Sequence, residues 1–187
     1  MMLMAEAREV PDGLLAERAR DGDRDAFARL VERHYDFIYR VAYRLTGRRE
    51  DAEDVAQDVC ARLGRAVKSY RGGAAFTTWL YALVMNAARD GLRKNKRESA
   101  RTEAFGVHSL VMGEGEPDRD DSADLLWAAV RELPDKQREA VTLVYGEGMS
   151  HAQAAEIMAV AEPTISWHVH EAKKRLKSAL LGRTRGE

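Results

Sequence analysis

The stretch from Phe76 to Arg101 combines an apolar helical stripe with a dense run of positive charge. Its apolar residues recur at i, i+3 and i+4, the spacing of one buried face of a helix; they are Phe76, Trp79, Leu80, Leu83, Val84, Ala87, Ala88 and Gly91. The opposite face and the end of the helix carry Asn86, Arg89, Arg93, Lys94, Lys96, Arg97 and Arg101. Bases stack on aromatic rings and phosphates pair with Lys and Arg, so this pattern suits a nucleic-acid strand with unpaired bases. A buried aromatic helix with a solvated basic end is the competing interpretation.

Charge is segregated along the chain, although the formal net charge is only -1. Residues 59–101 contain ten Lys or Arg against Asp90 and Glu98. Residues 102–135 reverse the balance, with nine Asp or Glu against Arg119 and Arg131. A basic block followed by an acidic one indicates a polyanionic partner, together with a segment that must stay off that partner's site or mimic the partner.

The single cysteine, Cys60, cannot form an internal disulfide and falls on the apolar stripe of a helix, which predicts a buried thiol in a reducing compartment. The opening residues lack the basic and apolar regions of a signal peptide, and no apolar run approaches the roughly 18 to 20 residues of a membrane span. We therefore expect a cytoplasmic protein.

Helical periodicity covers almost the whole chain, and sustained alternation at period two is absent from the sequence. We therefore predict an all-α fold. From Thr102 to Ser122 the periodicity lapses into a segment rich in glycine and acids, which is typical of a flexible linker. At 187 residues the chain has room for two small domains. We place them at 14–101 and 123–182, joined by an acidic linker at 102–122.

The segment from Gly148 to Leu180 predicts two short helices joined by a tight turn. Ser150 followed by Gln153 is a capping-box pattern, and Pro163 suits the first turn of a second helix. That helix has a predicted buried stripe of Ile165, Val169, Ala172, Leu176 and Leu180. Its outward residues would be Thr164, Ser166, Trp167, His170 and Glu171. This is the arrangement of a DNA-binding helix-turn-helix, although a plain helical hairpin is the alternative for the isolated segment.

Taken together, these motifs resemble a known family in their order and spacing. From about Asp25 to Leu181 the chain resembles the small, two-domain extracytoplasmic-function sigma factors of bacterial RNA polymerase. The resemblance rests on the sequences DAFARLVERHYDFIYRVAYRLTG, DAEDVAQDVCARL, SYRGGAAFTTWLYALVMNAARDGLRKNKR and LPDKQREAVTLVYGEGMSHAQAAEIM. It implies a region 2 domain at 14–101 and a region 4 helix-turn-helix domain at 123–182.

The resemblance also implies roles for particular residues. Polymerase binding falls on Asp51, Glu53, Asp54, Gln57 and Asp58. Opening and reading of the proximal promoter element fall on Tyr70, Arg71, Gly72, Phe76, Asn86, Arg89 and Arg93, together with Gly73 in the same loop. The carboxamide of Asn86 offers both a donor and an acceptor to an extruded base, and the arginines can hold phosphates.

The second helix of the helix-turn-helix departs from the family pattern. Ser166 and Glu171 stand where basic residues are usual, and Trp167 replaces a serine. Distal-element contacts are expected from Pro163, Thr164, Ser166, Trp167, His170 and Lys174. These changes point to an unusual element, to thymine contacts by Trp167, or to weaker binding that depends on a partner. Ala159 replaces a turn glycine, which we expect to be mild because alanine suits ordinary helical angles.

Several functional classes remain open or are disfavoured. The five histidines are scattered and suggest no catalytic constellation, so we expect no enzyme activity, no cofactor and no metal. The expected partners are core RNA polymerase, promoter DNA and, by resemblance alone, an anti-sigma factor. The alternatives are a stand-alone helix-turn-helix regulator, which would bind duplex DNA as a dimer, and a helical adaptor with little affinity for DNA.

Overall fold

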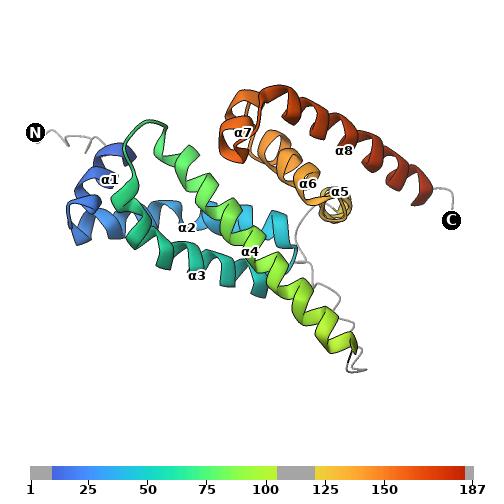
Figure 1. The fold of residues 1–187 in the computed structure, drawn as a ribbon, viewed down its shortest axis with the longest axis horizontal. Coiled ribbons are helices and arrows are strands. Elements are labelled where there is room, and N and C mark those ends of the chain that lie inside the picture. Colours follow the sequence, from blue (N-terminus) through green and yellow to red (C-terminus); the bar gives the residue numbers. More distant parts are fainter. Residues whose placement is uncertain (1–9, 105–120, 184–187) are drawn as a thin grey trace, which may run out of the picture.

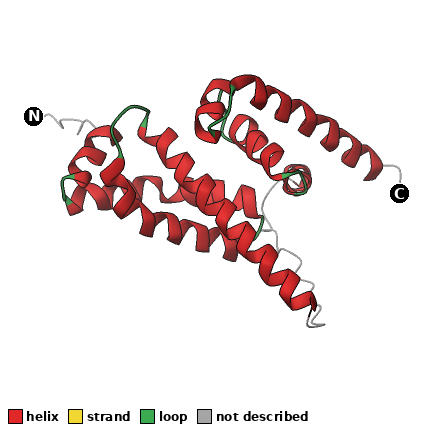
Figure 2. Cartoon of the chain, in the orientation of Figure 1, coloured by secondary structure: helices red, strands yellow, loops and turns green. Residues whose placement is uncertain are grey.

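The computed structural model describes residues 10–104 and 121–183, and every regular element within them is helical (Figure 2). The predicted all-α class is confirmed. The elements in chain order are α1 (Asp12–Arg20), α2 (Arg24–Thr46), α3 (Arg49–Ala66), the 3₁₀ turn η1 (Val67–Ser69), α4 (Phe76–Ala104), α5 (Asp121–Arg131), α6 (Asp135–Val141), the π-helical turn η2 (Thr142–Gly146), α7 (His151–Met158) and α8 (Glu162–Arg183). No helix among these residues is long and apolar enough to cross a membrane.

The N-terminal domain consists of α1 to α4. The carboxylate of Asp23 starts α2 by accepting hydrogen bonds from the backbone N–H groups of Asp25 and Ala26, each at 3.0 Å. The hydrogen bond from Ala26, together with Arg18, lowers the pKa of this carboxyl. Gly47 ends the helix in the left-handed conformation at φ 75°, which glycine adopts more readily than other residues.

A continuous apolar core holds these four helices together. Leu30, Ile38, Leu63 and Leu80 come from α2, α3 and α4, and each is fully buried. Their i, i+3, i+4 spacing in the sequence is the reason that each helix places one face inward. The core determines which face of α4 is buried, and Asn86 and Arg93 lie on its exposed side.

The C-terminal domain, α5 to α8, forms a second group of helices lying beside α4 (Figure 1). The capping box at the start of α7 is confirmed: Ser150 Oγ accepts from the Gln153 backbone, and Gln153 Oε1 accepts from the Ser150 N–H at 3.0 Å. Pro163 lies in the first turn of α8, as predicted. Helices α7 and α8 therefore form the expected helix-turn-helix.

The turn between α7 and α8 corrects one expectation. Ala159 does not adopt ordinary helical angles but the left-handed region, with φ 53° and ψ 48°. A Cβ atom makes this conformation unfavourable by roughly 1–2 kcal/mol. The backbone N–H groups of Ala159 and Val160 bond to carbonyls of the last turn of α7, and these bonds hold the strained cap in place.

The proposed boundary between the domains falls mainly on residues 105–120, which lie outside the described residues. Helix α4 runs on to Ala104 and α5 begins at Asp121, so helix occupies both ends of the expected linker. Elsewhere the two domains are in direct contact, because α4 packs against α7 and α2 packs against α5 and η2. One apolar cluster extends from Leu80 and Met85 to Ile157 and Ile165 across this contact.

Candidate nucleic-acid interface

The loop before α4 is shaped by buried aromatic rings. Tyr70 and Phe76, both expected to contact nucleic acid, are only 6% and 3% exposed. Their ring centroids lie 5.6 Å apart, and Trp79 lies 5.5 Å from each of them. Tyr70 Oη donates to the carbonyl oxygen of Ala74 at 2.9 Å, and burial raises the pKa of this phenol. The rings therefore support the loop from within, and they do not present a face to solvent.

Beyond the rings, the exposed part of the loop and α4 carry the remaining residues expected at the proximal element. Arg71 and Gly72 are exposed, and Gly72 has φ 71°, a conformation that favours glycine. On α4, Asn86 and Arg93 are exposed and Arg89 is half-buried. Arg89 Nη1 donates to Asn86 Oδ1 at 3.0 Å, so the two side chains form one polar unit one helical turn long.

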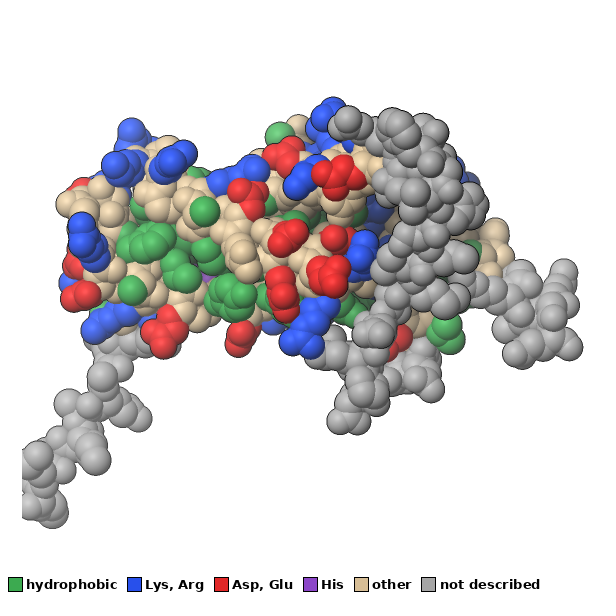
Figure 3. Space-filling view, turned by 90° about the horizontal axis from the view of Figure 1, so that it is seen from below, with side chains coloured by type: hydrophobic (Ala, Val, Ile, Leu, Met, Phe, Trp, Pro, Cys, Tyr) green, Lys and Arg blue, Asp and Glu red, His purple; other side chains and the backbone are tan. Residues whose placement is uncertain are grey.

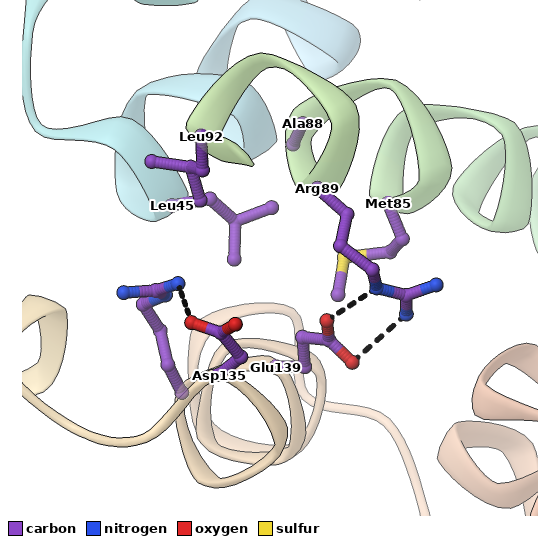
Figure 4. A pocket seen from close by; sticks show the side chains of 8 residues that line it. Leu45, Met85, Ala88, Arg89, Leu92, Asp135 and Glu139 are labelled. Carbon is purple, nitrogen blue, oxygen red and sulfur yellow. Dashed lines mark hydrogen bonds and ion pairs between the residues drawn. The ribbon is translucent and has the colours of Figure 1, made fainter. Parts of the chain in front are cut away.

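Arg89 also reaches the other domain. Its Nε and Nη2 atoms donate to the two carboxylate oxygens of Glu139 on α6 at 2.7 and 2.9 Å (Figure 4). This contact forms one wall of a small pocket between α4 and α6, lined by Leu45, Met85, Ala88, Arg89, Leu92, Asp135, Arg138 and Glu139. The hydrogen bond to Glu139 raises the pKa of Arg89, which strengthens its hold on a proton.

The residues expected to bind polymerase lie along one side of α3. Asp54 and Gln57 are exposed, while Asp51, Glu53 and Asp58 are half-buried. Three of the carboxylates have arginine partners on the same helix or its cap: Arg48 at 3.9 Å from Asp51, Arg49 at 3.1 Å from Glu53 and Arg62 at 2.6 Å from Asp58. Figure 3 shows acidic side chains gathered beside hydrophobic ones on the underside of the molecule. Such a surface can meet basic and apolar groups together.

The outward face of α8 is open. Trp167 is 57% exposed, and Pro163, Ser166, His170 and Lys174 are also exposed, while Thr164 is half-buried. A hydrogen bond of 2.9 Å between His151 Nδ1 and Ser166 Oγ links α7 to α8. The ammonium of Lys174 lies 3.1 Å from the carboxylate of Glu171, which partly neutralises the acid in this unusual helix.

Cys60 and His168 are both half-buried, unlike the exposed residues of these surfaces. Cys60 is thus not fully buried, contrary to the prediction, and its partial burial raises the pKa of its thiol, which makes it a poor nucleophile. Desolvation lowers the pKa of His168, so that this ring is held neutral. Among the described residues, no group of three His, Cys, Asp or Glu side chains could hold a metal ion.

Sequence reasoning missed the contacts between the domains. Glu139 and Glu147 of the C-terminal domain bind Arg40, Arg44, Tyr81 and Arg89 of the N-terminal domain. The partners are separated by between 50 and 107 residues in sequence. The charge segregation did not reveal them, because Glu139 and Glu147 lie outside the acidic block at 102–135, although Arg89 lies within the basic block at 59–101.

Comparison with known proteins matches two separate parts of the chain to two family models. The family model for sigma-70 region 2 matches residues 30–98, and the model for sigma-70 region 4 matches residues 123–176. The extracytoplasmic-function (ECF) RNA polymerase sigma factor SigM of Mycobacterium tuberculosis is 35% identical over 162 residues, which cover 86% of this chain and 80% of SigM. SigW of Bacillus subtilis, another ECF sigma factor, is 29% identical over 175 residues, 88% of this chain and 94% of SigW.

Among solved structures, one similar chain is the sigma factor RpoE from Bartonella quintana in complex with the anti-sigma factor NepR. Its TM-score is 0.67 at 25% identity, over 82% of this chain and 96% of RpoE.

Proposed function

Because the chain belongs to the ECF sigma factors of the sigma-70 family, we propose that it binds core RNA polymerase and directs promoter-specific initiation of transcription. The observation that carries this proposal is the presence of both family regions, in order, in one chain whose two helical domains match them. A stand-alone helix-turn-helix regulator would have no use for a region 2 domain with an acidic face on α3. The protein supplies binding and positioning, and it needs no covalent chemistry of its own.

The work divides among three surfaces. The acidic face of α3, from Asp51 to Asp58, is our candidate for the contact with core polymerase. Asn86 and Arg89 on α4, with the loop at Arg71 and Gly72, would hold an extruded base and the adjoining phosphates of the proximal element. Extrusion costs a few kcal/mol, which contacts to the flipped base can offset. The outward face of α8 would lie in the major groove of the distal element.

We also propose that an anti-sigma factor regulates the protein and that it acts in the cytoplasm, where core polymerase resides. The structure of RpoE with NepR supports the first point, since that relative binds such an inhibitor over a fold similar to this one. A protein inhibitor of this kind would compete with polymerase for the surfaces named above.

The test is reconstitution with bacterial core polymerase. The double substitution Asp54→Lys and Asp58→Lys should abolish binding to core and promoter-dependent transcription, because it turns the acidic face basic. Circular dichroism should be unchanged, since Asp54 is exposed and Asp58 is half-buried at the helix surface.

Glu32→Lys with Asp36→Lys is the matched control, because it makes the same change of charge on exposed acids of α2. The control should keep its affinity for core. Wild-type affinity in the α3 variant would refute the assignment of this face, and a wild-type protein unable to direct any transcription start would refute the function.

A further inference from the structure

Two glutamates of the C-terminal domain are buried where the domains meet. The side chains of Glu139 and Glu147 are each 5% exposed. A buried carboxylate is strongly unfavourable unless charged and hydrogen-bonding partners surround it. The partners of both residues come largely from the other domain, so in the closed form these groups take the place of the water that would solvate the carboxylates if the domains parted.

Glu147 is held by three side chains of the N-terminal domain. Tyr81 Oη donates to Oε2 at 2.6 Å, Arg40 Nη2 lies 3.3 Å from the same oxygen, and Arg44 Nη1 pairs with Oε1. Burial and the bond to Glu147 raise the pKa of Tyr81, so its hydroxyl remains a donor. Arg44 also donates to the carbonyl oxygen of Gly146 at 2.6 Å, and its guanidinium lies 5.2 Å from the ring centroid of Trp127.

Glu139 binds Arg89, the residue that forms a polar unit with Asn86 on α4. Its carboxylate takes two N–H donors of Arg89 in the paired geometry with which a guanidinium also binds a phosphate. Lys136, on the same helix as Glu139, lies 3.2 Å away. Arg89 also donates to the oxygen of the Asn86 side chain, which leaves that oxygen one further lone pair. Base reading by Asn86 needs that acceptor together with the amide donor.

We propose that Glu139 and Glu147 form an autoinhibitory latch, in which carboxylates of the C-terminal domain stand in for nucleic-acid phosphate on the N-terminal domain. The proposal rests on the function assigned to α4. In the closed form Arg89 is taken by Glu139, and α6 and η2 cover the adjoining part of α2 and α4. The proximal element can pair with Arg89 only when the domains part, whereas Asn86, the loop at Arg71 and Gly72, and the outward face of α8 are already exposed while the domains are in contact.

The experiment compares the full-length wild type with the variant Glu139→Gln, Glu147→Gln in the absence of polymerase. Small-angle scattering measures the radius of gyration, and fluorescence anisotropy measures binding of a labelled single-stranded oligonucleotide of mixed sequence. Glutamine keeps the shape of each side chain and removes its charge. We expect a larger radius of gyration and oligonucleotide binding tighter by roughly tenfold, the gain when a competent state rises from about a tenth of the population to most of it.

Two further variants separate the latch from simple electrostatics. Glu156→Gln with Glu162→Gln removes two exposed charges from the same domain, and it should leave the radius unchanged with only a small gain in binding. Arg40→Gln with Arg44→Gln breaks the latch from the other side while removing positive charge, which by itself would weaken binding to DNA. We expect this variant to expand and to bind at least as tightly as the wild type.

An unchanged radius of gyration in both latch variants would show that these contacts do not hold the domains together, and it would overturn the latch. It would have no bearing on whether the wild type binds core polymerase and directs transcription. The inhibitory role would be overturned if the glutamine variant expanded without a gain in oligonucleotide binding, or if the arginine variant expanded and bound more weakly than the wild type. If the glutamine pair fails to fold, the arginine pair decides both points. Failure of the proposed function would appear instead as absence of core binding by the wild type.

Discussion

The two helices proposed to read DNA, α4 and α8, are held in different ways. Helix α4 has one face in the N-terminal core and part of the opposite face under the C-terminal domain, where Arg89 binds Glu139. Helix α8 has one face on its own domain, while Trp167 on the other face is more than half exposed. One conformation of the chain can therefore leave the outward face of α8 accessible while it withholds Arg89 of α4 from DNA.

The largest expected effect is the loss of unfolding free energy when a core residue under either helix is truncated, and the two helices should differ in which parts of the chain loosen. Leu80→Ala in α4 should cost about 2–5 kcal/mol of unfolding free energy, since the side chain is fully buried, and it should loosen both domains because α4 packs against α2 and α3 and also against α7, whereas α8 packs mainly against α5, α6 and α7. Ile165→Ala in α8 should cost a similar amount but loosen mainly α5 to α8. Hydrogen exchange followed by mass spectrometry distinguishes the two patterns. Equal loosening of α2 and α3 by Ile165→Ala would break the comparison.

Base reading by α4 is the next effect in size. Asn86→Ala should lower selectivity at one position of the proximal element by about 1–3 kcal/mol, because a donor and acceptor pair is lost. Transcription from templates carrying each base at each position measures this, with polymerase binding unchanged. Asn95→Ala on the same helix is the control and should keep the wild-type profile. An unaltered profile in Asn86→Ala would count against the pocket.

A smaller effect is expected on the exposed face of α8. Trp167→Ala should weaken recognition of the distal element by roughly 1 kcal/mol, the low end for a base contact. A template already melted at the proximal element should largely restore transcription. Tyr145→Ala removes an equally exposed aromatic ring outside α8 and should have no such effect. If Trp167 instead contacts an inhibitor, the substitution will release inhibition and leave promoter activity intact.

The smallest effect concerns the turn that sets the angle of α8. Ala159→Gly should stabilise the C-terminal domain by about 0.5–1 kcal/mol, because glycine relieves the left-handed strain but gains freedom in the unfolded chain. Ala161→Gly, at a position without positive φ, should give no gain. Denaturant unfolding measures both. A loss of stability in Ala159→Gly would mean that the methyl group makes packing contacts that outweigh the strain.

Local features of the chain could be predicted from sequence because their physical causes lie within a few residues. The spacing of Leu80, Val84 and Ala88 determines the buried face of α4, and Ser150 with Gln153 determines the start of α7. The same holds for the helix stop at Gly47 and for the exposure of Trp167. The family resemblance extended this local information to two domains in a known order.

Tertiary structure alone decided how those domains meet. Nothing near Glu139 or Glu147 in sequence identifies Arg89 or Arg44 as a partner, because such contacts arise only after two separately formed surfaces dock. The same reason explains the burial of the Tyr70 and Phe76 rings, which aromatic content alone could not distinguish from a stacking surface. Ala159 is left-handed because backbone bonds to α7 outweigh its own preference, and residue type cannot reveal that balance. Sequence determined which helices form and which charges they carry, and docking determined which of those charges remain free to meet DNA.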